Sequence, residues 1–246
     1  MGLGWALEAD GNLYLLLGIP ITAGFQLLIS RRPLHTLWVR DAVPFRLCRP
    51  AIALATAIAA APIASLARYL AGPGESPEWV RVAWLLSAAA GGVGAAFAFR
   101  HFSRATVRLL LACAATAGTF GVALMVAARL ARPVDSSLTA GAALTALWWF
   151  LVYLPVAFVL EEVFFRGALD AHVHRGGDSH GVRSAVFVSA LWGLWHLPVA
   201  PAHGSVVGTV SGLLVVHLVI GIPLSLYWRR SGNLAVPATT HAFVDA

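Results

Sequence analysis

The chain has 246 residues, of which 59% are hydrophobic and 11% charged, with a formal net charge of +6. Because soluble domains carry about a quarter of their residues as charged side chains, this composition argues against a soluble fold. The arginines stand between hydrophobic runs rather than in one patch, which argues against a nucleic-acid partner. We predict an all-α, polytopic transmembrane helical bundle whose surroundings are the lipid bilayer.

Apolar segments follow one another along the whole chain. Several runs of 17 to 20 residues contain no charge, and such runs are long enough to cross roughly 30 Å of hydrocarbon as helices. We expect the fifth segment to continue as one helix past Glu161 and Arg166. The eight predicted spans are residues 12–30, 51–67, 82–99, 109–128, 140 to beyond 166, 182–198, 206–228 and 234 onward.

The arginines between the spans predict the orientation of the bundle. The connections after the first, third, fifth and seventh spans carry Arg31, Arg32, Arg40, Arg46, Arg49, Arg100, Arg104, Arg108, Arg175, Arg183, Arg229 and Arg230. The alternate connections have few arginines or balance them with acids such as Glu75, Glu78 and Asp135. The positive-inside rule then places the N-terminus outside and the four arginine-rich connections in the cytoplasm. An alanine-rich chain with no lysine is typical of a bacterial protein, so we expect a multi-pass protein of the bacterial cytoplasmic membrane.

Ionisable residues recur inside the later apolar spans. Each costs ~2.5–3.5 kcal/mol on insertion scales, so a cluster of them is by default a functional hypothesis. Glu161 lies 14 residues before Arg175, His196 lies 13 after Arg183, and His241 lies 11 after Arg230. At about 1.5 Å per residue, all three lie roughly 16–21 Å from the cytoplasmic charges. Three helices therefore place polar groups in one layer, which predicts an active site within the membrane that opens to the cytoplasmic side.

Helical spacing assigns these side chains to faces. Three pairs stand four residues apart: Glu162 and Arg166, Trp192 and His196, and His241 and Asp245. Residues at this spacing share a helix face. We therefore expect an ion pair between Glu162 and Arg166, and an indole at Trp192 that orients the imidazole of His196. We also expect the Asp245 carboxylate to accept a hydrogen bond from the His241 ring. Glu161 points about 100° away from Glu162 and stays free to face a cavity.

The same residues carry a family resemblance. The segment Glu161-Glu162-Val163-Phe164-Phe165-Arg166 resembles the EExxxR signature of the CPBP family of intramembrane glutamic endopeptidases, which includes type II CAAX prenyl proteases and bacteriocin-processing (Abi) proteins. Trp192-Gly193-Leu194-Trp195-His196 resembles its FxxxH motif, with Trp192 in place of the usual Phe. His241-Ala242-Phe243-Val244-Asp245 resembles its terminal HxxxN/D motif, with Asp245 where the eukaryotic prenyl proteases have Asn.

The resemblance covers about residues 140–246. It implies one membrane domain, residues 1–246, in which residues 1–139 are accessory N-terminal transmembrane helices and residues 140–246 form the catalytic core. It also implies a glutamate-dependent peptidase that requires no metal or other cofactor. In a bacterial chain, the expected substrate is a peptide precursor or the tail of a membrane protein rather than a prenylated protein. The sequence specifies neither the cleavage site nor the oligomeric state.

On this hypothesis Glu161 is the general base for a water that His196 helps to hold. His241 stabilises the oxyanion, and Asp245 either joins it, if protonated, or orients its ring. Glu162, Arg166 and Trp192 are supporting residues, although Glu162 and Arg166 could also form an ion pair that only supports packing.

Other functions use the same residues. One Glu and two His could complete a catalytic zinc site, but the sequence lacks an HExxH helix. A non-catalytic membrane scaffold or immunity protein, and a transporter with a polar permeation path, are the alternatives outside the peptidases. We interpret His217 as a core histidine, and His172, His174 and His180 as part of a solvated turn rather than a metal-binding tract.

Overall fold

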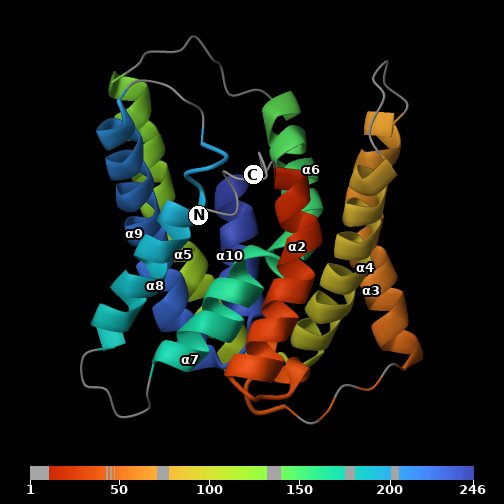
Figure 1. Ribbon diagram of the computed structural model, residues 1–246. Helices are drawn as coiled ribbons and strands as arrows, with labels where there is room; N and C mark the ends of the chain where they lie inside the picture. Colours follow the sequence, from red (N-terminus) through yellow and green to blue (C-terminus); the bar gives the residue numbers. More distant parts are fainter. Residues whose placement is uncertain are drawn as a thin grey trace.

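The computed structural model describes residues 11–42, 44, 46, 48–70, 78–131, 140–174, 181–200 and 205–246. In these ranges the chain forms a helical bundle (Figure 1), and the β-type pairing found there is one isolated bridge between Val39 and Asn233. The predicted all-α class is therefore confirmed. The elements are α2 (Gly11–Gly24), η1 (Phe25–Ile29), η2 (Leu34–Leu37), α3 (Arg49–Leu70), α4 (Glu78–Arg100), α5 (Arg104–Ala131), α6 (Ala140–Ala157), η3 (Val163–Asp170), α7 (Ala171–Val173), α8 (Gly181–Trp195), α9 (Val206–Ser231) and α10 (Ala235–Asp245).

Four helices of the described part are long and apolar enough to cross a membrane. They are Arg49–Ala67, Glu78–Arg100, Arg104–Leu124 and Val206–Ser231, and the shorter apolar helices are Leu13–Ile29 and Gly141–Ala157. Large apolar side chains such as Leu111 and Leu144 are 64% and 69% exposed, as expected of a surface that faces lipid. The chain is thus a membrane protein. A helix occupies each of the eight predicted segments, but the count of eight spans stays a prediction.

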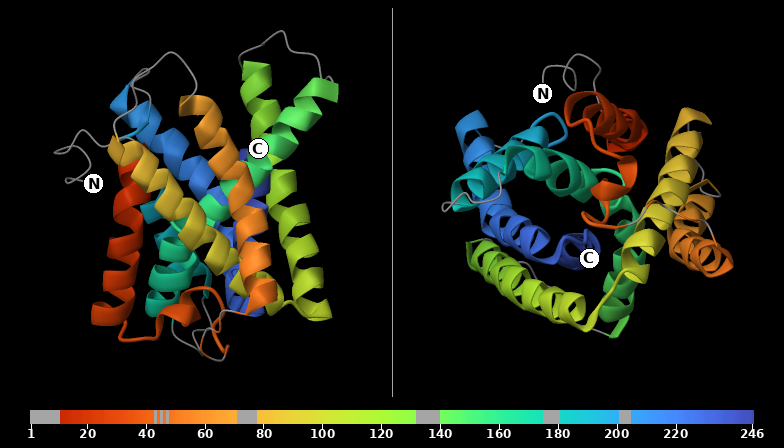
Figure 2. Two further views of the ribbon diagram at one scale, coloured as in Figure 1. Left: turned by 90° about the vertical axis from the view of Figure 1, so that its right-hand side faces the viewer. Right: turned by 90° about the horizontal axis from the view of Figure 1, so that it is seen from below.

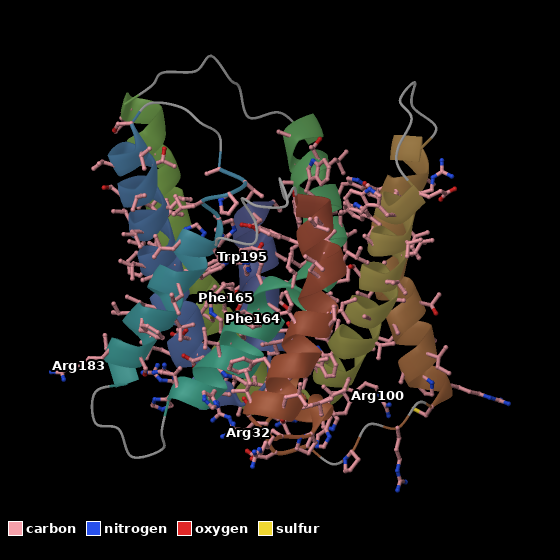
Figure 3. The ribbon with its side chains drawn as sticks, in the orientation of Figure 1. Arg32, Arg100, Phe164, Phe165, Arg183 and Trp195 are labelled. Atoms are coloured by element: carbon pink, nitrogen blue, oxygen red, sulfur yellow. The ribbon has the colours of Figure 1, made fainter. Side chains whose placement is uncertain are left out.

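Three arginines at or near the ends of helices lie at one end of the bundle (Figure 3). Arg32, Arg100 and Arg183 all lie at the lower end in Figure 3. Glu75, Asp135, Arg175 and His180 lie outside the described residues. The sidedness, with the N-terminus outside, therefore stays a prediction.

The fifth segment is not one continuous helix, and this part of the prediction was wrong. α6 ends at Ala157, and the backbone turns at residues 158–160 before it becomes helical again at Glu161. The chain leaves α6 through tight turns, with Phe158 N donating to Pro155 O (3.1 Å) and Val159 N to Val156 O (3.0 Å). The indole of Trp38 donates to Phe158 O (3.1 Å), which satisfies a carbonyl freed by the break. Irregular backbone at membrane depth is tolerated only inside protein, and Phe158 is fully buried.

The helix after the break has an unusual geometry. η3 is a π-helix, a form that is rare and often found at functional sites. It packs against α2, η2, α8 and α9. The break and the wide turns of η3 together set where the two glutamates point.

The last helix lies inside the bundle. α10 packs between α5, α6 and α9 and is enclosed when the molecule is seen from below (Figure 2). Its start is fixed by Asn233, whose side-chain oxygen accepts from Ala235 N (2.9 Å) and whose amide donates to Ala98 O (2.8 Å). Gly232 takes the left-handed conformation (φ 60°) that ends α9, a position that favours glycine. This corner directs His241 into the bundle.

The break in the fifth segment depends on close contact with α4. A Cβ at Gly91 would collide with the Pro155 carbonyl. We therefore expect Gly91→Ala to destabilise the protein by about 1–3 kcal/mol through overpacking, measured as a lower melting temperature in detergent. Gly212→Ala is the control, because a Cβ there meets no described atom within 4 Å. Equal melting temperatures for the two variants would contradict the close packing at the break.

Candidate active site

Three polar side chains, two from the end of α8 and one from α10, lie against the carboxylate of Glu161. The Trp192 indole donates to Oε2 at 2.6 Å. The Nε2 atoms of His196 and His241 lie 3.6 and 3.7 Å from the same oxygen. The Glu161 side chain is 19% exposed, so small molecules such as water can reach it although most of its surface is buried by protein. The structure thus brings together the residues that the depth argument placed in one layer, while their catalytic roles stay predictions.

Glu162, the neighbouring carboxylate, lies in a buried ion pair. Its Oε1 accepts from Arg166 Nη1 at 2.7 Å, and both side chains are 0% exposed. Arg166 also donates to Gly221 O on α9 at 3.3 Å, and its Cζ lies 4.3 Å from the Trp192 ring centroid. The guanidinium therefore joins η3 to α8 and α9, and the spacing of four residues pairs the charges as expected.

His241 lies among the three carboxylates of the site. Its Nδ1 is 3.0 Å from Glu162 Oε1, and its Nε2 is 3.0 Å from Asp245 Oδ2. A ring with protons on both nitrogens would meet a carboxylate on each side. Asp245 is 45% exposed, while His241 is 6% exposed. This geometry suits Asp245 as the acceptor that orients His241, one of the two roles considered for it.

His196 is held by the backbone as well as by the indole. Its Nδ1 lies 2.9 Å from Trp192 O, so Nδ1–H donates and Nε2 faces Glu161. The Trp192 and His196 rings meet edge to face with centroids 6.0 Å apart. The expected packing of the indole against the imidazole is therefore present, and the backbone carbonyl of Trp192 adds a second contact that orients the ring. α8 ends at Trp195, and the carbonyls of a last helical turn lack partners, so the ring of His196 can bond to one of them.

His217 borders the site, which the sequence motifs did not indicate. It is buried, and its Nδ1 donates to Leu213 O (2.7 Å). Its ring centroid lies 4.4 Å from that of His196 and 4.5 Å from that of Trp192. The burial of His217 fits its interpretation as a core histidine. Its contacts with two residues of the candidate site, His196 and Trp192, were not expected from that interpretation. The signal that could have found it is depth, since it lies 12 residues before Arg229.

A small cavity adjoins the carboxylates. It measures about 60 Å³ and is lined by Tyr153, Val156, Ala157, Glu161, His241, Ala242 and Asp245. A cavity of this size and polarity can hold water, which needs about 10–15 Å³ of such volume and two or more polar partners. Glu161 therefore faces a space that water can enter, as the spacing argument expected.

The other histidine group is not part of this site. His172 Nδ1 lies 3.3 Å from Ser30 Oγ, and its ring meets Phe25 edge to face at 5.5 Å. Within the described ranges, no group of three or more His, Cys, Asp or Glu side chains is arranged to hold a metal ion. The zinc alternative is thus left to chelation experiments.

The C-terminal part of the chain matches a known family. Residues 143–246 match the family model described as type II CAAX prenyl endopeptidase Rce1-like. The matched region begins in α6 and ends in α10, so it includes every residue of the site described above. No curated protein and no solved structure matches the chain.

The buried ion pair generates a stability prediction. Arg166→Met leaves Glu162 as an unpaired buried charge, which we expect to cost about 3–5 kcal/mol. Arg81→Met is the matched control, because the Arg81–Glu78 pair is 43% and 79% exposed and should contribute less than about 1 kcal/mol. Melting temperatures in detergent measure both. Equal losses would mean that the Glu162–Arg166 pair does not support the bundle.

Proposed function

We infer that this chain, whose residues 143–246 match the type II CAAX prenyl endopeptidase Rce1-like family model, is an intramembrane endopeptidase that hydrolyses a peptide bond with a water activated by Glu161. The observation that carries this proposal is the convergence of Trp192, His196 and His241 on one carboxylate beside a small cavity. Ionisable side chains that cluster inside a membrane-spanning bundle usually belong to a functional site.

The cavity beside Glu161 has room for a water next to the acid and base groups. At 3.6 and 3.7 Å, the imidazoles of His196 and His241 are beyond direct hydrogen-bond distance of Glu161 Oε2, and a water at the edge of the gap can contact both the carboxylate and a ring. Oε1 of Glu161 accepts a proton from this water, and Nε2 of His196, which faces Oε2, helps to hold the water. The water oxygen then attacks the peptide carbonyl carbon.

His241 serves the second half of the reaction. The attack places negative charge on the carbonyl oxygen, and a donor fixed in advance at that position stabilises it. The N–H at Nε2 of His241 serves as this donor and is shared between the oxyanion and Asp245 Oδ2, which lies 3.0 Å from Nε2 and holds the ring in orientation. Glu161 then gives its proton to the leaving amine as the tetrahedral intermediate collapses. Glu162 and Arg166 keep η3 in place.

The substrate is proposed by class. The site lies among membrane helices, so the scissile peptide belongs to a membrane-associated protein or peptide. α8 ends at Trp195, directly before His196, and α10 ends at Asp245; Figure 3 shows Trp195 well above Arg183, which lies near the start of α8. An opening toward the cytoplasmic side, like the bacterial membrane location, therefore stays a proposal. Labelling of Asp245→Cys by a membrane-impermeant thiol reagent from each side tests it.

The first experiment is cleavage of a quenched peptide library by detergent-purified protein. We expect Glu161→Ala and His196→Ala to lower the rate by at least about 100-fold, the range of lost general acid–base catalysis. Glu78→Ala and His101→Ala, which lie outside the site, are the matched controls and should cleave like the wild type. EDTA should leave the wild-type rate unchanged.

Several results would contradict this proposal. Full activity of Glu161→Gln would remove Glu161 as the base. Loss of activity in EDTA with rescue by zinc would favour a metal-dependent peptidase. No cleavage of any membrane-associated peptide by the wild type would favour a non-catalytic scaffold with the same fold.

A further inference from the structure

Trp192 occupies the centre of the site and contacts most of its members. The side chain is 3% exposed. Arg166 lies over its ring at 4.3 Å, and the rings of His217 and His241 meet it edge to face at 4.5 and 4.8 Å. An indole held on its face and edges in this way has little freedom to swing. Its N–H therefore has a fixed direction.

That N–H points at the Glu161 carboxylate. At 2.6 Å, it is the one donor in the described part of the chain within hydrogen-bond distance of Glu161, because His196 and His241 stand at 3.6 and 3.7 Å. For Trp192, His196 and His241 alike, the nearest Glu161 oxygen given by these distances is Oε2. In the described ranges, Oε1 of Glu161 meets no such group and is the oxygen left for other partners.

We propose that Trp192 is a positioning residue, which anchors one carboxylate oxygen of Glu161 through its indole N–H so that the other oxygen receives the proton of the attacking water. This inference rests on the proposed function of Glu161. A glutamate side chain has three rotatable torsions, and loss of alignment at a reacting group can cost on the order of 100-fold in rate. The anchor removes that freedom before the substrate arrives.

The anchor is particular to the residue found at this position. Phenylalanine, the usual residue of the FxxxH motif, would fill the aromatic site but carries no donor. A buried indole normally needs an acceptor for its N–H, so Trp192 and Glu161 satisfy each other. A tryptophan in place of phenylalanine at this position thus adds a hydrogen-bond donor directed at the proposed base.

Two variants separate the N–H from the ring. Trp192→Phe removes the donor, and replacement of Trp192 by benzothienylalanine, which has sulfur where the indole has N–H, keeps the bicyclic shape. With a cleaved library peptide, we expect both to lower kcat by about 10- to 100-fold, as for the loss of a hydrogen bond to a charged group, with KM and melting temperature unchanged. Trp228→Phe is the control, because Trp228 is fully buried and its Nε1 lacks a hydrogen-bond partner in the described structure.

A spectroscopic measurement tests the bond without a substrate. In protein labelled with ¹⁵N at the indole nitrogens, the Trp192 proton, assigned by its loss in Trp192→Phe, should resonate downfield and move upfield in Glu161→Ala. An unmoved resonance, wild-type kcat in Trp192→Phe, or full kcat in the benzothienyl variant would each overturn the anchor. Activity retained by Glu161→Ala would instead overturn the proposed function, which distinguishes the two failures.

Discussion

The buried pair of Glu162 and Arg166 is the interaction on which the rest of the site depends. Both side chains are 0% exposed, and a charge without its partner in such a place would cost several kcal/mol. The pair therefore fixes two rotamers on η3. From that fixed point Arg166 reaches the face of Trp192 and a carbonyl of α9, while Glu162 lies against His241 of α10. One ion pair thus connects four helical elements, and the proposed catalytic groups take their places around it.

The opposite end of η3 is held by a second pair. Asp170 accepts from Arg229 Nη2 at 2.6 Å and from Nε at 2.9 Å, a two-point geometry that orients a carboxylate firmly. Arg229 also donates to Ser184 Oγ on α8 at 3.0 Å. A π-helix is rare and usually only one turn long, and side-chain contacts at both ends of η3 help to stabilise it. The fold accepts an irregular segment because side chains from α8 and α9 stabilise it.

Much of the site could be predicted from the sequence, because it depends on local rules. Helical spacing alone placed Glu162 on Arg166 and His241 on Asp245, and counting residues from the flanking arginines placed Glu161, His196 and His241 at one depth. The break before Glu161 could not be predicted in this way. Its contacts come from distant segments: the Trp38 indole donates to Phe158 O across 120 residues of sequence, and Gly91 of α4 lies against the Pro155 carbonyl. The contacts of His217 and the hydrogen bond from the Trp192 indole to Glu161 likewise depend on how α8 and α9 pack. A local sequence pattern does not predict that packing.

The two adjacent glutamates that follow the break have different environments. In a continuous helix, Glu161 and Glu162 would point about 100° apart, and neighbouring helices would decide whether either met water. Here the turn at residues 158–160 ends α6 beside the cavity, so that Ala157 and Glu161 line it together. Glu162 faces inward and is neutralised by Arg166. Two adjacent carboxylates can lie within the membrane because Glu162 forms an ion pair with Arg166. Glu161 keeps 19% exposure and accepts a short hydrogen bond from the Trp192 indole. A proposed base needs this combination of partial solvation and fixed direction, and the break in the helix makes it available.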